Sequence, residues 1–184
     1  VAVTVYVNKR KGTASTADLR QESLAETVAQ ACAIARFTEA DQASGLADRE
    51  LLATEVMDFD LWHPSELPPE QGIALALETE AAGLQQKNIS NSDGASYGSS
   101  RSTAVYGNSH GFMGAERSTN YSISCSLIAG KDSAMQRDYW YSEARAASDL
   151  LAAEKIGQIA AERAVRRLNS RKLDTMQVPV LFEA

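Results

Sequence analysis

The run Gly107-Asn108-Ser109-His110-Gly111 has the G-x-S-x-G spacing that places a nucleophilic serine in many hydrolases. In those enzymes the serine lies between a strand and a helix, and a histidine later in the chain activates it. No histidine follows this run, and residues 112–127 alternate like a strand instead of opening a helix. We therefore interpret the run as a tight glycine-rich turn between two strands, and we expect no catalytic residue in it.

The histidines and cysteines are too dispersed to predict a metal site. His63 and His110 belong to no H-x-x-x-H or H-E-x-x-H pair, and Cys32 and Cys125 lie in unlike contexts. We expect no metal ligand in this chain. His63 precedes Pro64 and fits a structural role. His110, together with Asn108 in the same turn, is our candidate for contact with a substrate or partner, because loop residues often carry binding functions.

A second candidate surface is the aromatic patch Arg137-Asp138-Tyr139-Trp140-Tyr141. In a strand, alternate side chains point to opposite faces, so half of these aromatic side chains are expected to pack in a core. We expect Tyr139 and Tyr141 to be the ones that contact a peptide or a partner protein, since exposed aromatic side chains are enriched at interfaces.

Composition describes an ordinary globular chain. The 184 residues are 44% hydrophobic and 23% charged, enough for one large domain or two small ones. A net charge of −6 is the wrong sign for binding nucleic acid through its phosphates. No apolar run is long enough to span a membrane, and the first residues do not resemble a signal peptide, so we expect a cytoplasmic protein with no membrane association.

The first half of the chain predicts a hairpin and two helices. Residues 1–7 alternate like a half-buried strand, a polar turn is expected at 9–12, and a return strand at 13–16. Helical spacing predicts a helix over 22–37, followed by a connector with apolar anchors over 41–71. A further helix is expected from Pro69 to about Gln86; its apolar stripe consists of Ile73, Leu77, Ala81 and Leu84.

The second half predicts strands followed by a helix. Residues 88–126 are rich in serine and threonine, but apolar Tyr121, Ile123, Cys125 and Leu127 alternate with serines, which favours a strand with one buried and one hydroxylated face. Further turns are expected at 93–94, 107–108 and 130–132, a helix over 152–168, and a last strand over 178–182. Helices and antiparallel hairpins in blocks indicate the α+β class, with possible sub-parts 1–87 and 88–184.

Several short blocks, in order along nearly the whole chain, resemble the TldD/PmbA family, whose members have been called modulators of DNA gyrase. The later blocks resemble its PmbA branch, also called TldE. The blocks are Lys11-Gly12-Thr13-Ala14-Ser15 with Asp18, Ala35-Arg36-Phe37-Thr38, Leu46-Ala47-Asp48, Asp60-Leu61-Trp62-His63-Pro64, Gly107-Asn108-Ser109-His110-Gly111, Arg137-Asp138-Tyr139, Asp149-Leu150, Arg171-Lys172-Leu173 and Val178-Pro179-Val180.

The resemblance implies a subunit of a peptidase complex that degrades or matures unfolded peptides. In such complexes zinc belongs to the TldD-type chain, bound by a helix that follows the strand resembling residues 178–182. The resemblance implies no cofactor in this chain, a TldD-like subunit or a second copy as partner, and a C-terminal β domain of the family outside these residues. Two alternatives stay open: a stand-alone peptide-binding module, and a regulator that interacts with DNA gyrase.

Overall fold

A computed structural model of the chain describes residues 1–182 and divides it into two compact units, Val1–Glu55 and Val56–Ala184. We call them the N-terminal unit and the C-terminal unit. The boundary differs from the sub-parts 1–87 and 88–184 suggested by the sequence. The reason is that the helix α2 (Pro69–Leu84) packs on the sheet and helix that follow it, and so belongs to the second unit.

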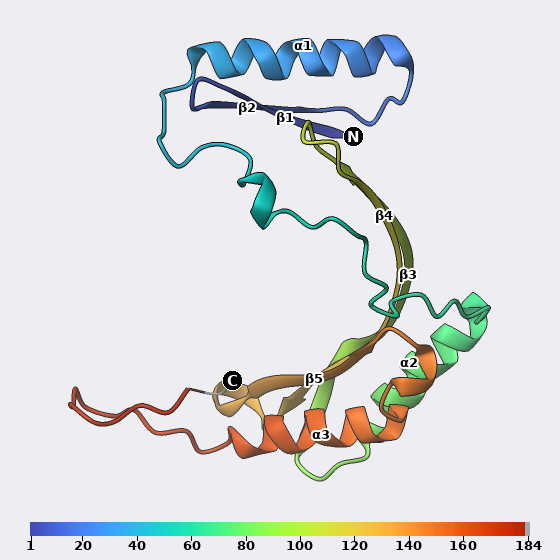
Figure 1. The fold of residues 1–184 in the computed structure, drawn as a ribbon. Coiled ribbons are helices and arrows are strands. Elements are labelled where there is room, and N and C mark those ends of the chain that lie inside the picture. The colour runs from blue at the N-terminus through green and yellow to red at the C-terminus, as the bar shows by residue number, and fades with distance from the viewer. Residues whose placement is uncertain (183–184) are drawn as a thin grey trace. The chain divides into compact units, whose positions relative to one another are not determined.

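The N-terminal unit is a hairpin covered by one helix (Figure 1). Strands β1 (Ala2–Val7) and β2 (Arg10–Ser15) pair antiparallel, and α1 (Gln21–Phe37) packs on them. The turn is shorter than the predicted 9–12. Asn8 and Lys9 have φ of 50° and 64°, which gives a two-residue loop whose twist matches that of the strands. A short 3-10 helix, η1 (Arg49–Leu51), follows.

Gly12 allows α1 to approach the hairpin closely. A Cβ atom at this position would collide with the backbone carbonyl oxygen of Ala31. The buried residues of the helix, Thr27, Ala31 and Ala35, are accordingly small. The predicted helix is confirmed, and its contact surface is defined by small side chains rather than by large apolar ones.

The C-terminal unit is a three-stranded antiparallel sheet with two helices on one face. The strand order is β3 (Ile89–Gly107), β4 (Met113–Ala129), β5 (Gln136–Ala144), and α3 (Ala153–Arg166) packs beside α2. Short 3-10 helices, η2 (Asp132–Ala134) and η3 (Ala147–Asp149), flank β5. β3 and β4 continue beyond the helices as a long curved hairpin (Figure 1). The α+β prediction is confirmed.

β3 runs without a turn where the sequence predicted one. At Asp93-Gly94 the register with β4 shifts by one residue, which is a β-bulge, and Gly94 has φ of 111°. The predicted separation into two strands is therefore wrong. Gly94 has a backbone conformation that other residues rarely adopt. The strand nevertheless continues beyond the bulge, because its pairing with β4 resumes there.

The core of this unit is centred on β4, whose alternation is confirmed. Tyr121, Ile123, Cys125 and Leu127 are at most 2% exposed and face the helices. The intervening serines are half-buried on the opposite face. Burial raises the pKa of the Cys125 thiol to about 11, with a smaller effect from Glu80, so this cysteine behaves as an inert apolar side chain.

The two helices touch through backbone rather than through large side chains. A Cβ atom at Gly157 of α3 would collide with the carbonyl oxygen of Thr79 and would lie 2.8 Å from the amide nitrogen of Gly83, both in α2. Because α2 uses its small residues for this contact, its predicted apolar stripe is left outside the core. Ile73 and Leu77 are 59% and 60% exposed.

The predicted last strand is not formed. Residues 178–182 belong to no helix or strand, and their large apolar side chains are exposed. The sequence pattern suits a strand, but a strand needs a neighbour to pair with, and residues 1–182 provide none at this segment. Within the same range, the structure contains no helix with the length and apolarity to cross a lipid bilayer.

Gly157→Ala is expected to destabilise the C-terminal unit by about 1–3 kcal/mol, because the added methyl group forces the two helices apart. Gly107→Ala is the control: its Cβ would find its nearest neighbour at 3.6 Å, and a change below about 1 kcal/mol is expected. Both tryptophans, Trp62 and Trp140, lie in this unit, so tryptophan fluorescence during urea unfolding reports on it. Equal stability of the two variants would contradict the close helix contact.

Candidate functional site

The face of the sheet that carries no helix presents a row of hydroxyl groups, and we call it the open face. On β4 it carries Ser122, Ser124 and Ser126. The Ser124 hydroxyl lies 2.9 Å from the hydroxyl of Ser96 on β3. The predicted hydroxylated face of this strand is therefore confirmed, and its groups can donate and accept hydrogen bonds.

One ion pair and one side-chain hydrogen bond link the strands on the open face. Arg137 of β5 donates to Asp93 across 2.7 Å, and Asn120 of β4 donates to Glu143 across 2.8 Å. Asp93 occupies the bulge, so the bulge sets the position of this carboxylate. A pocket of about 370 Å³ lies here; its lining residues include Asp93, Ser96, Ser124, Arg137 and Tyr139. Sequence reasoning missed Asp93 and Ser96, because only the bulge and the register bring them together.

Tyr139 and Tyr141 lie on this open face, as expected for the exposed half of the aromatic patch. They are 57% and 51% exposed, and their rings are stacked with centroids 6.3 Å apart. The residue between them, Trp140, points the other way and packs against the core. Aromatic rings beside hydroxyl groups form an amphipathic surface that suits contact with a polypeptide.

The second candidate pair, Asn108 and His110, lies in the turn that closes the β3–β4 hairpin. The Asn108 side-chain oxygen accepts a hydrogen bond from the His110 amide at 3.0 Å, and Gly111 has φ of 95°. Ser109 therefore lies in a tight turn between two strands, as interpreted from the sequence. The strand-to-helix elbow of a serine hydrolase is not formed here.

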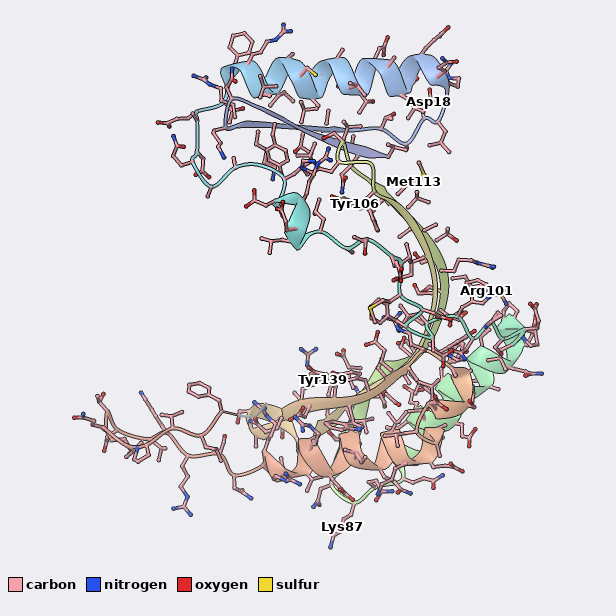
Figure 2. The ribbon with its side chains drawn as sticks, in the orientation of Figure 1. Asp18, Lys87, Arg101, Tyr106, Met113 and Tyr139 are labelled. Carbon is pink, nitrogen blue, oxygen red and sulfur yellow. The ribbon has the colours of Figure 1, made fainter. Side chains whose placement is uncertain are left out.

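The structure does not bring the two candidate pairs together. Tyr141 is paired with Ser124, while the turn begins where Gly107 is paired with Met113. Eleven residues of strand separate these positions on β4, roughly 37 Å along an extended chain. Figure 2 shows Tyr139 on β5 well away from Tyr106 and Met113 near the turn. The open face and the hairpin turn are thus separate surfaces.

The connector before α2 is held to β4 by two buried side chains. The hydroxyl of Thr119, a residue with no exposed surface, accepts a hydrogen bond from the His63 amide at 3.0 Å. The Tyr121 hydroxyl donates to the His63 carbonyl at 2.9 Å and accepts from the Ser65 amide at 2.7 Å. His63 therefore lies in a structural anchor. The sequence feature that could have indicated this anchor is Thr119, a polar residue at a position of β4 where the alternation directs the side chain into the core.

Two arginines near the end of α3, Arg163 and Arg167, stabilise a carboxylate of β5. Asp138 has a 12% exposed side chain and forms ion pairs with Arg163 and Arg167 at 3.4 and 3.5 Å. Burial alone would raise the pKa of Asp138, but the Tyr139 amide and the two guanidinium groups outweigh burial and lower it. These arginines have a structural partner and are not a free anion-binding patch.

The donor set does not fit a metal centre. Within residues 1–182, no three histidine, cysteine, aspartate or glutamate side chains lie close enough to hold an ion. His63 is in the connector, His110 in the hairpin turn and Cys125 in the core, whereas Cys32 belongs to the N-terminal unit. We derive no chemical step through a metal from these residues.

Two sequence models of one family match the chain in order. The first domain of the PmbA/TldA metallopeptidases matches residues 1–35, and their central domain matches residues 62–168. The central domain alone covers more than half of the chain. The chain belongs to the PmbA/TldD family. Its two compact units thus correspond to successive domains of this family.

Similarity to curated members of the family is high but covers only part of their length. The chain is 45% identical to metalloprotease PmbA of Escherichia coli O157:H7 over 99% of its own length and 41% of that protein. It therefore spans about two fifths of the length of the curated relatives it matches.

Solved structures with the same fold agree with this family assignment. A candidate modulator of DNA gyrase from Bacteroides thetaiotaomicron matches with a TM-score of 0.79 and 28% identity, over 94% of this chain and 40% of that one. TldE from Thermococcus kodakarensis matches with a TM-score of 0.63 and 17% identity, over 89% of this chain and 36% of that one. The second similarity is one of fold.

Tyr141→Ala is expected to lower the free energy of unfolding by less than about 1 kcal/mol, because the ring is half exposed and loses mainly cross-strand contacts. Trp140→Ala is the matched comparison and should cost about 3 kcal/mol, since this ring packs against the core. Urea unfolding followed by circular dichroism measures both. Equal losses of unfolding free energy would contradict the placement of Trp140 on the core side of β5 and Tyr141 on its open face.

The chain is expected to bind no stoichiometric zinc after dialysis, because its soft donors lie on separate elements and cannot complete a four-ligand site. Elemental analysis of the purified chain measures this. One tightly held zinc ion per chain would contradict the prediction, and His63→Ala and His110→Ala would then identify the ligands.

Proposed function

We propose that this chain is part of a PmbA/TldE-type subunit of a cytoplasmic peptidase complex that acts on unfolded peptides. The observation that carries the proposal is the 45% identity, over 99% of this chain, to a protein named metalloprotease PmbA. In the proposed complex the zinc belongs to a TldD-like partner, and this subunit contributes no metal ligand from its two N-terminal domains. Its partner is that TldD-like chain or a second copy.

The open face is the surface we assign to contact with the unfolded peptide or the partner chain. An unfolded peptide has no fixed side-chain pattern, so a general receptor needs hydroxyl groups for its backbone and rings for its apolar side chains. Tyr139, Tyr141 and the serine row offer both on one side of a sheet. A contact of this kind positions peptide without taking part in bond cleavage.

The test is a reconstitution with three arms: the full-length protein that contains this chain, a TldD-like partner, and both together. Hydrolysis of an unfolded labelled casein and zinc content are measured in each arm. We expect activity in the mixture and zinc only where the partner is present. Tyr139→Ser with Tyr141→Ser should raise the KM of the mixture several-fold and leave its zinc content unchanged, because the rings contact polypeptide and not the reacting bond.

Different outcomes separate the alternatives. Hydrolysis and zinc in the full-length protein alone would overturn the non-catalytic role. Binding of unfolded casein with no activity in any arm would favour a stand-alone peptide-binding module. Binding to gyrase in place of a TldD-like chain would favour the regulator.

A further inference from the structure

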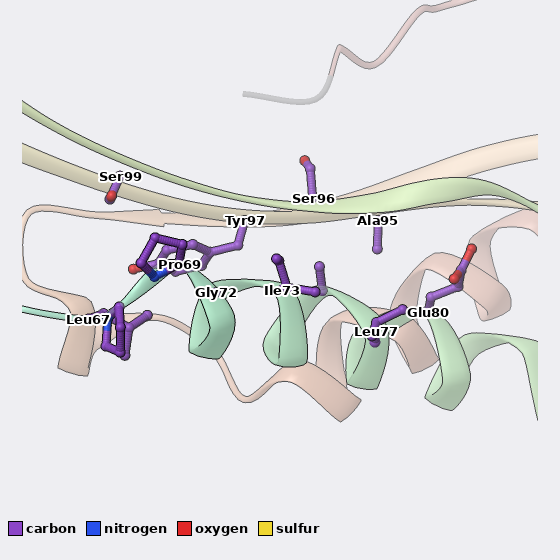
Figure 3. Close-up of a pocket in the computed structure, with 12 residues that line it drawn as sticks. Leu67, Pro69, Gly72, Ile73, Leu77, Glu80, Ala95, Ser96, Tyr97 and Ser99 are labelled. Carbon is purple, nitrogen blue, oxygen red and sulfur yellow. The ribbon is translucent and has the colours of Figure 1, made fainter.

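A groove on the other side of the sheet lies between β3 and α2, away from the open face (Figure 3). Its volume is about 580 Å³. Ala95 and Tyr97 point from β3 toward α2, and Ser96 of the opposite face also lines the groove. Since residues of both faces of β3 contribute, the groove extends along the free edge of this strand.

That edge is unpaired. β3 is the outer strand of the sheet order, and its backbone pairs with β4 on one side only within the described chain. Every second residue therefore directs its N–H and C=O groups away from β4. The bulge at Asp93-Gly94 interrupts the edge, but residues 95–101 beyond it are regular. Seven residues of strand give a free edge of roughly 23 Å.

The apolar stripe of α2 forms the other wall. Ile73 and Leu77 both line the groove and are more than half exposed. Four residues along a helix correspond to about 6 Å. Alternate side chains of an extended peptide are about 6.8 Å apart, so two of them can contact Ile73 and Leu77 in succession.

Two polar groups of the groove also lack partners within residues 1–182. Glu80 lies about one turn beyond Leu77, is half-buried, points toward the sheet and forms no ion pair within residues 1–182. The hydroxyl oxygen of Tyr97 is buried and has no hydrogen-bond partner. A half-buried carboxylate attracts a cationic side chain, and a buried hydroxyl without a partner carries a free-energy cost that a hydrogen bond to a peptide group would remove.

We propose that this groove binds an extended peptide segment by strand addition to β3, with apolar side chains on Ile73 and Leu77 and a lysine or arginine beside Glu80. The free edge supplies the backbone hydrogen bonds, and the α2 stripe and Glu80 supply the preference for side chains. This site is separate from the open face, and it does not depend on the proposed peptidase complex.

The probe is a fluorescein-labelled, end-capped nonapeptide that alternates valine and threonine and carries a lysine near each end. Fluorescence anisotropy with the full chain measures its affinity. Two further versions are N-methylated at every second residue, one on each edge of the peptide. Only one edge faces β3, so one version should lose at least about tenfold in affinity and the other should bind like the parent.

Variants of α2 locate the site. Leu77→Gln should weaken binding by about tenfold, while Leu84→Gln, on the same stripe but outside the groove, should not change it. Glu80→Gln should weaken binding of the lysine-containing peptide several-fold. It should leave unchanged the affinity for a version of the peptide that carries glutamine in place of lysine. Glu78→Gln, an exposed position on α2, is its control.

Three results would overturn the proposal. Equal affinity of both N-methylated peptides would exclude strand addition. Unchanged binding to Leu77→Gln would place the peptide elsewhere, for example on the open face. Absence of peptide binding together with self-association that Leu77→Gln abolishes, seen by sedimentation, would mean that a second copy fills the groove. Because no peptidase partner is present, none of these results tests whether the chain belongs to a peptidase complex, so failure of the groove proposal and failure of the proposed complex are distinguishable.

Discussion

The pairing of β4 with strands on both sides is the constraint on which the C-terminal unit depends. Its inward side chains, from Tyr121 to Leu127, have almost no exposed surface, and its outward serines define the open face. A one-residue change of register would exchange the two sets and place hydroxyl groups against the helices. The buried core and the candidate contact surface are therefore specified by the same alternation, and neither can change without the other.

β4 also fixes the position of the connector that precedes α2. Thr119 and Tyr121 hold the connector through the backbone of His63 and Ser65, so the chain enters α2 from a defined position. These hydrogen bonds are partly buried, and an unsatisfied partner in such a place is costly. The anchor explains why a proline-containing connector with little regular structure ends at the first residue of a well-packed helix.

Much of the architecture could be predicted from periodicity, and the failures have distinct causes. The three helices and the inward and outward phases of β4 follow from spacings of 3.6 and 2 residues, which are local properties. The turn predicted at Asp93-Gly94 is a bulge because pairing with β4 resumes beyond it, and pairing is not encoded locally. Residues 178–182 have a strand pattern and no strand beside them. For the candidate site, sequence placed Tyr139 and Tyr141 on one face, but it could not show that Asn108 and His110 lie on another surface.

The most instructive difference concerns α2. Its large apolar residues follow a helical stripe, and the usual inference is that such a stripe faces the core. In the structure the buried residues of α2 are Gly72, Thr79 and Gly83. The backbone of α3 approaches Thr79 and Gly83 closely, and the ring of Tyr97 on β3 lies against Gly72, so larger side chains do not fit there. The close contact between helices therefore leaves Ile73 and Leu77 exposed beside an unpaired strand edge, and the packing of the core itself creates the groove.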